Sequence, residues 1–133
     1  SCGNPVRERG SYMADVLFLE YPKCSTCKKA KAWLDAHGVA YADRHIVEDN
    51  PTADELAAWH AASGLPLRRF FNTSGMVYRE RNVKALLDAG MGDEEAYALL
   101  AEDGMLVKRP LVVGEGFVLV GVKEAEWEQV LLG

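Results

Sequence analysis

The chain has 133 residues, of which 49% are hydrophobic and 26% are charged, and its formal net charge is −5. This length suits one hydrophobic core and is too short for two comfortable domains. The acidic balance argues against direct binding to nucleic acid or to an anionic membrane. No apolar run is long enough to span a bilayer, and the layout of a signal peptide is missing. We therefore expect a single cytoplasmic domain.

The start of the chain differs from the rest. Residues 1–12 show no hydrophobic periodicity and precede Met13, from which a compact domain can begin. We expect this stretch to be an expression scar or a disordered extension, and residues 13–133 to form the domain. Cys2 lies in the stretch, so the chemistry rests on Cys24 and Cys27.

A strand–helix–strand unit opens the domain. Residues 15–21 predict a buried strand, and residues 25–37 predict a helix that Gly38 closes in the left-handed conformation. Residues 41–46 predict a second strand. Such a unit pairs its two strands in parallel through a right-handed crossover.

A helical region follows. Thr52 and Glu55 have the spacing of a capping box, and the helix that they open turns Trp59 inward. Residues 63–102 are interrupted by glycine and proline and predict short helices without a strand, the last of them capped by Asp93. This region separates the first unit from the end of the chain.

The chain ends in a hairpin and a helix. The apolar runs 111–113 and 117–120 flank a Gly-Glu-Gly turn, which predicts an antiparallel pair of strands. Residues 123–132, with Trp127 and Val130 at helical spacing, predict an amphipathic helix. The full order is βαβ, a helical insert, then ββα.

The strongest chemical signal is Cys24-Ser25-Thr26-Cys27, between the first strand and its helix. Unpaired N–H groups and the macrodipole at a helix N-terminus stabilise a thiolate. Two cysteines on the first turn can also close a small disulfide that is easier to reduce than a structural one. A redox or nucleophilic role is the leading hypothesis.

Two other interpretations of the cysteines stay open: inert buried thiols, or half of a zinc site. Zinc needs further ligands. The candidates are Cys2, His37, His45 and His60, and none forms a second short-spaced pair. We expect no metal.

Basic residues gather near the sequence motifs. They are Lys23, Lys28, Lys29, Lys31, Arg68, Arg69, Arg79, Arg81, Lys108 and Arg109. If the fold brings them together, they form an anion-binding site on an acidic protein. The alternative is that they are the solvated faces of amphipathic helices.

Four separated motifs resemble the ArsC/Spx/MgsR family, and the resemblance covers residues 16–133. The motifs are Tyr21-Pro22-Lys23-Cys24-Ser25-Thr26-Cys27-Lys28-Lys29-Ala30, Phe70-Phe71-Asn72-Thr73-Ser74-Gly75, Tyr78-Arg79-Glu80 and Lys108-Arg109-Pro110-Leu111. The resemblance implies an α/β, thioredoxin-like fold (βαβ-ββα) with a helical insert between the two halves.

The resemblance also implies roles for residues. Cys24 is then the nucleophile and Cys27 its disulfide partner, with no bound cofactor and with glutathione or thioredoxin as external reductant. Pro110 matches the position that is cis in thioredoxin-like proteins, and Arg109 beside it binds an anionic substrate or neutralises a thiolate. The further expected substrate-binding residues are Lys23, Ser25, Thr26 and Asn72.

One feature departs from the arsenate reductases, which bind the oxyanion with three arginines. Arg109 has a clear counterpart, whereas Asn72 stands at the second position and only Lys123 lies near the third. Motifs 70–75 and 78–80 are closer to the Spx/MgsR branch. We expect a thiol/disulfide oxidoreductase acting on a disulfide or an oxyanion. The alternative is a redox-sensing transcription regulator that binds the C-terminal domain of the RNA polymerase α subunit.

Overall fold

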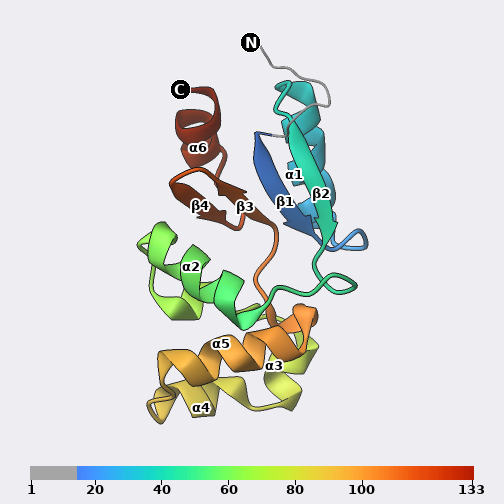
Figure 1. Ribbon diagram of the computed structural model, residues 1–133. Helices are drawn as coiled ribbons and strands as arrows, with labels where there is room; N and C mark the ends of the chain where they lie inside the picture. Colours follow the sequence, from blue (N-terminus) through green and yellow to red (C-terminus); the bar gives the residue numbers. More distant parts are fainter. Residues whose placement is uncertain (1–14) are drawn as a thin grey trace.

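The computed structural model describes residues 15–133 (Figure 1), so the expectation for residues 1–12 lies outside the described residues. The first half contains β1 (Val16–Glu20), α1 (Ser25–Ala36) and β2 (Tyr41–His45). The middle contains α2 (Ala53–Ser63), η1 (Leu67–Phe70), α3 (Met76–Glu80), α4 (Val83–Asp88), α5 (Asp93–Glu102) and η2 (Gly104–Leu106). The end contains β3 (Leu111–Gly114), β4 (Phe117–Val120), α6 (Glu124–Trp127) and η3 (Glu128–Leu132).

The four strands form one mixed sheet in the order β2-β1-β3-β4. Strands β1 and β2 are parallel, and β3 pairs antiparallel with both β1 and β4. The predicted strand–helix–strand unit and the predicted hairpin are therefore both confirmed. Their two halves meet in the centre of the sheet, where Phe18 of β1 lies opposite Val112 of β3.

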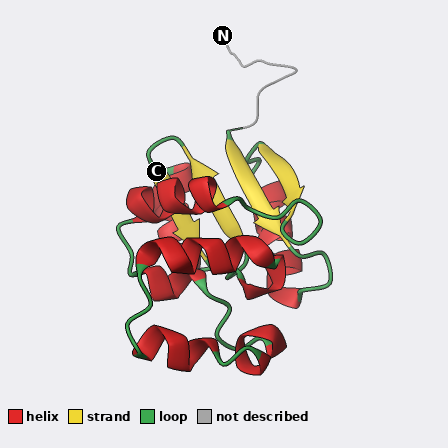
Figure 2. Cartoon of the chain, turned by 60° about the horizontal axis from the view of Figure 1, so that its bottom comes forward, coloured by secondary structure: helices red, strands yellow, loops and turns green. Residues whose placement is uncertain are grey.

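Helices cover both faces of the sheet (Figure 2) because its strands carry apolar side chains on both faces. On one face, Phe18 and Val112 pack with Leu34 of α1 and Trp127 of α6. Trp127 is fully buried, and its indole N–H donates to the Gly121 carbonyl at 3.2 Å. The predicted amphipathic end of the chain thus closes this face.

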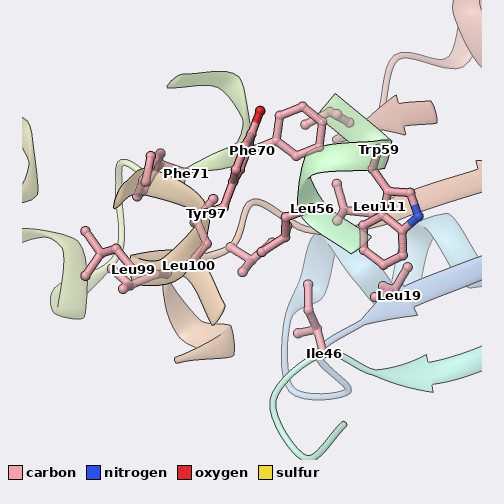
Figure 3. Packing of buried hydrophobic residues seen from close by; sticks show 14 of the residues in the cluster. Leu19, Ile46, Leu56, Trp59, Phe70, Phe71, Tyr97, Leu99, Leu100 and Leu111 are labelled. Carbon is pink, nitrogen blue, oxygen red and sulfur yellow. The ribbon is translucent and has the colours of Figure 1, made fainter. Parts of the chain in front are cut away.

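The opposite face packs against α2 and the helical insert (Figure 3). Leu19 of β1 and Leu111 of β3 contribute to one continuous cluster with Leu56 and Trp59 of α2. The cluster extends into the insert through Phe70, Phe71, Tyr97, Leu99 and Leu100. The insert is therefore joined to the sheet by a shared core.

Local signals end and begin the helices much as predicted. Gly38 has φ +68°, and the N–H groups of Gly38 and Val39 donate to the carbonyls of Asp35 and Leu34. These two bonds close the C-terminus of α1 in the Schellman arrangement. At α2 the Thr52 side chain accepts from the Glu55 N–H while the Glu55 carboxylate accepts from the Thr52 N–H, which confirms the capping box.

Two details of the prediction are wrong. Asp93 is the first residue of α5, and Gly92 holds the cap position without a side-chain bond. An acidic side chain in the first turn still complements the helix dipole, so the sequence signal was off by one residue. Val130 is 40% exposed, because the chain after Trp127 continues as a π-helical turn that rotates this side chain outward.

Within residues 15–133, no helix has the length and apolar character required to cross a bilayer.

Candidate active site

Cys24 is the N-cap residue of α1, and its position follows from a tight turn after β1. Its N–H donates to the Tyr21 carbonyl at 2.9 Å, and its own carbonyl accepts the first helical bond from Lys28 at 3.0 Å. The Cys24 side chain is half-buried, whereas Cys27, one turn later, is fully buried. Both are free thiols. The turn therefore presents one sulfur and hides the other.

The two thiols have opposite acidity. Partial burial works to raise the pKa of Cys24, but the N–H and thiol of Cys27, the Thr26 N–H and the Arg109 guanidinium outweigh it, so this pKa lies below the usual thiol value. Burial raises the pKa of Cys27 to about 12, despite the Tyr21 N–H that points at its sulfur from 3.5 Å. Cys24 is the thiol with thiolate character.

A pocket of about 360 Å³ opens at Cys24. It is lined by Cys24, Thr26, Asn72, Ser74, Gly75, Lys108, Arg109, Gly121 and Val122. The structure thus brings four of the predicted site residues together: Cys24, Thr26, Asn72 and Arg109. It adds Lys108 as a second cation, which the sequence offered only as one of many scattered basic residues.

Other predicted site residues lie outside this lining. Lys23 and Ser25 are exposed on the turn and at the start of α1, and Pro110 is buried behind Arg109. Lys123, which stands near an arginine position of the arsenate reductases, is exposed and does not line the pocket either. The positive charge in the lining of the pocket therefore comes from Lys108 and Arg109.

One backbone bridge assembles the far side of the pocket. Phe71 pairs antiparallel with Val107, the Asn72 N–H donates to the Leu106 carbonyl at 2.7 Å, and the Lys108 N–H donates to the Phe70 carbonyl at 2.8 Å. This pairing sets the two segments side by side. Sequence reasoning missed the bridge because it consists of a single pair and carries no strand pattern.

Arg109 is fixed by contacts on two sides. Its guanidinium carbon lies 5.2 Å from the centre of the Tyr21 ring, and its Nη1 donates to the Met105 carbonyl at 3.3 Å. The Arg109–Pro110 peptide bond is cis, as predicted. Arg109 is thereby held where its guanidinium lowers the pKa of Cys24.

The histidines considered as zinc ligands make contacts with other groups. A ring nitrogen of His60 lies 2.6 Å from the Tyr97 hydroxyl, and the His45 ring accepts from the N–H groups of Val47 and Glu48. Within residues 15–133 no three His, Cys, Asp or Glu side chains cluster as metal ligands would. Cys2 lies outside the described residues.

A carboxyl pair beneath α1 was not anticipated from the sequence. Glu20, 4% exposed, is the one buried charged residue in the described part of the chain, and its partners are Asp43 on β2 and Lys31 on α1. Burial and the neighbouring Asp43 raise the pKa of Glu20 to about 7. Burial works to raise the pKa of Asp43 too, but its bonds to Glu20 and Lys31 lower it. The two carboxyls therefore share one proton near neutral pH.

The sequence pattern of the ArsC family matches residues 19–130, which include both cysteines and the whole pocket lining. The chain belongs to the ArsC family. It is 51% identical to YusI of Bacillus subtilis (strain 168) over 112 residues, which cover 84% of this chain and 94% of YusI. It is 29% identical to the global transcriptional regulator Spx of Staphylococcus saprophyticus, covering 83% of this chain and 82% of Spx.

Solved structures agree with this assignment. An ArsC family related protein from Bacteroides fragilis superposes with a TM-score of 0.83 at 57% identity, covering 86% of this chain and 96% of that one. A possible arsenate reductase from Streptococcus mutans superposes with a TM-score of 0.79 at 43% identity, covering 87% and 99%. The predicted thioredoxin-like fold with a helical insert is confirmed, and the family includes both reductase-like and regulatory relatives.

Proposed function

We propose that this protein is a thiol/disulfide oxidoreductase in which Cys24 attacks the substrate and Cys27 resolves the intermediate. The observation that carries the proposal is the difference between the two thiols. Cys24 lines an open pocket and has a lowered pKa, whereas Cys27 is fully buried and has a raised one. An attacking thiol must be ionised and accessible, while a resolving thiol acts only within the protein.

The reaction balances as a two-electron exchange. The Cys24 thiolate attacks one sulfur of a disulfide, forms a mixed disulfide and expels the other half as a thiolate, which takes up a proton. Cys27 then loses its proton and attacks the Cys24 sulfur, which releases the second thiolate and closes the Cys24–Cys27 bond. The protein is oxidised and the substrate disulfide is reduced. An external thiol, glutathione or thioredoxin, restores both cysteines in a reducing cytoplasm.

The pocket favours a disulfide over arsenate as substrate. Two cationic side chains, Lys108 and Arg109, line the pocket, and Asn72 adds a neutral amide. Replacing an arginine by an amide removes a charge-assisted bond, worth roughly 1.5–3 kcal/mol for a bound anion. Arsenate, a compact oxyanion, needs such bonds more than a disulfide does.

A redox-sensing regulator is the second candidate, and the identity to Spx supports it. Such a regulator uses the same Cys24–Cys27 bond as a switch and binds the C-terminal domain of the RNA polymerase α subunit. Stoichiometric binding that changes with oxidation, without turnover, would favour this role.

The test is single-turnover oxidation of the reduced protein by a disulfide and, separately, by arsenate, with mass spectrometry of the products. We expect a Cys24–Cys27 bond with the disulfide, and a trapped mixed disulfide at Cys24 in Cys27→Ser. Steady turnover with glutathione or thioredoxin would then separate the enzyme from the switch. The proposal is wrong if neither oxidant closes the bond.

A further inference from the structure

A second, smaller hollow adjoins the Cys24 pocket. It has a volume of about 110 Å³ and is lined by Arg68, Arg69, Phe71, Thr73 and Lys108. We call it the side hollow. Lys108 lines both the side hollow and the Cys24 pocket, so the two share a wall. The two hollows are therefore neighbours, and Lys108 can contact a ligand in either one.

The same backbone bridge that builds the pocket also builds the side hollow. The Lys108 N–H donates to the Phe70 carbonyl at 2.8 Å, and Phe71, 1% exposed, pairs with Val107. This pairing holds Arg69, which directly precedes Phe70, close to Lys108 along the adjoining segment. The side hollow thus combines one buried apolar side chain, Phe71, with cationic side chains.

The cations around the two hollows differ in their partners. Arg68 is bonded to Asp88, which also accepts from Lys84 at 2.7 Å. Among residues 15–133, no carboxylate lies within salt-bridge distance of Arg69, Lys108 or Arg109.

Among the residues that the structure describes, neither lining contains an aspartate or glutamate, although acidic residues outnumber basic ones by 20 to 15 in the whole chain. Such a concentration of unpaired positive charge beside a reactive thiol attracts an anion.

We propose that the side hollow binds a carboxylate of a small disulfide whose sulfur is attacked by Cys24. This inference rests on the proposed function and narrows its substrate to an acidic low-molecular-weight thiol in its disulfide form. Arg69 offers a planar fork of donors that matches a carboxylate, Lys108 adds a point charge, and the Thr73 hydroxyl can donate a further bond.

The dimensions fit a small molecule. Hollows of about 360 and 110 Å³ together match the range of small-ligand pockets, which begins near 300 Å³. In the first step the expelled half leaves as a thiol, and the half that stays bonded to Cys24 keeps its carboxylate in the side hollow. That half leaves as the second thiol when Cys27 attacks, so the electron balance is that of the proposed reaction.

The test compares three symmetric disulfides of similar size: dithiodipropionate, which is anionic, hydroxyethyl disulfide, which is neutral, and cystamine, which is cationic. The second-order rate constant for oxidation of the reduced full-length protein is measured for each. In the wild type we expect the anionic disulfide to react fastest and the cationic one slowest. In Arg69→Gln we expect the ratio of the anionic to the neutral rate constant to fall about five-fold, as for loss of an exposed ion pair.

Arg81→Gln is the matched control, because it removes the same charge from an exposed arginine that is paired with Glu102 and lines neither hollow. In Arg81→Gln the ratio of the anionic to the neutral rate constant should equal that of the wild type. If the ratio of the anionic to the neutral rate constant is unchanged in Arg69→Gln, or falls equally in Arg81→Gln, the proposal that the side hollow binds a carboxylate is wrong. The proposed reaction at Cys24 would still stand. If none of the three disulfides oxidises the wild type, the proposed function fails, and this inference fails with it.

Discussion

The two sides of the Cys24 pocket are built in different ways. One side, the helix wall, consists of Cys24 and Thr26 at the start of α1, where neighbouring N–H groups set the acidity of the thiol. The other side, the insert wall, includes Asn72 and Lys108, which the Phe71–Val107 bridge sets side by side, and Arg109, which packs on the Tyr21 ring. Reactivity is thus largely local, while recognition depends on tertiary structure. The two properties should fail separately when each wall is altered.

The largest effect is expected from the helix wall itself. Cys24→Ser should reduce disulfide reduction to the uncatalysed background, because among residues 15–133 no other thiol lines the pocket. Cys27→Ser should still form a mixed disulfide at Cys24 but should not release the second half of the substrate. Mass spectrometry of the reacted proteins distinguishes the two. A mixed disulfide on Cys27 in the Cys24→Ser protein would reverse the roles assigned here.

Gly104→Ala should damage the insert wall by destabilising the place where the insert returns to the sheet. A Cβ at this buried position would clash with the carbonyl group of Ile46 and the backbone of Val47. Because backbone atoms cannot move aside as a flexible side chain does, we expect a loss of roughly 2–4 kcal/mol in the free energy of unfolding. Denaturant titration measures it.

Gly92→Ala is the control for that substitution, since within the described residues, apart from its two chain neighbours, no heavy atom lies within 4 Å of a Cβ at this position. Its cost should stay at or below about 1 kcal/mol, the effect of an unfavourable cap residue. If Gly104→Ala and Gly92→Ala lose the same free energy of unfolding, the connection between the insert and the sheet is not tightly packed.

Glu20→Gln tests the carboxyl pair that Lys31 of α1 contacts. The pKa of Glu20 is raised from 4.5 to about 7 in the folded protein, so between these pH values the unfolded chain releases the proton first. The stability of the wild type should therefore fall as the pH rises from about 4.5 to 7. The lowered pKa of Asp43 acts only at more acidic pH, where its contribution is lost as the pH falls.

In Glu20→Gln the neutral amide can still donate to Asp43, so the fall in stability with rising pH should disappear. We expect the variant to be more stable at pH 8 by about 1–3 kcal/mol, from thermal unfolding at several pH values. Glu128→Gln, an exposed acid on η3, serves as control and should leave the pH dependence unchanged. If the stability of Glu20→Gln still falls as the pH rises, another titrating group causes the fall.

The smallest effect is expected where the two walls interact. Arg109 belongs to the insert wall, yet its guanidinium is one of the groups that lower the pKa of Cys24. Arg109→Gln should raise that pKa without bringing it fully to the ordinary thiol value, because the backbone N–H groups remain. Lys28→Gln removes a charge from α1 outside the pocket lining and should shift it less. Iodoacetamide labelling against pH gives both values, and a larger shift in Lys28→Gln would contradict the account.

The sequence predicted the features that depend on neighbours in the chain. Gly38 as a left-handed terminus, the Thr52–Glu55 capping box and the placement of Cys24 at a helix start all follow from local backbone chemistry. The resemblance to the family added the cis bond before Pro110, which is confirmed, and the role of Arg109, which stays a prediction.

What the sequence could not supply depends on contacts between distant segments. Lys108 and Ser74 reach the pocket through one isolated bridge, which leaves no periodicity to detect. Glu20 sits in an otherwise apolar strand, and only the structure reveals that Asp43 and Lys31 meet it there. For the same reason the choice among ten basic residues was open until the fold placed four of them, Arg68, Arg69, Lys108 and Arg109, around the pocket and the side hollow.

The most direct test of the central claim is site-resolved alkylation of the reduced wild-type protein across pH. The account predicts that Cys24 is labelled with a midpoint below that of an ordinary cysteine, while Cys27 stays unlabelled in the folded protein up to high pH. Equal labelling of both thiols, with midpoints near that of free cysteine, would contradict it.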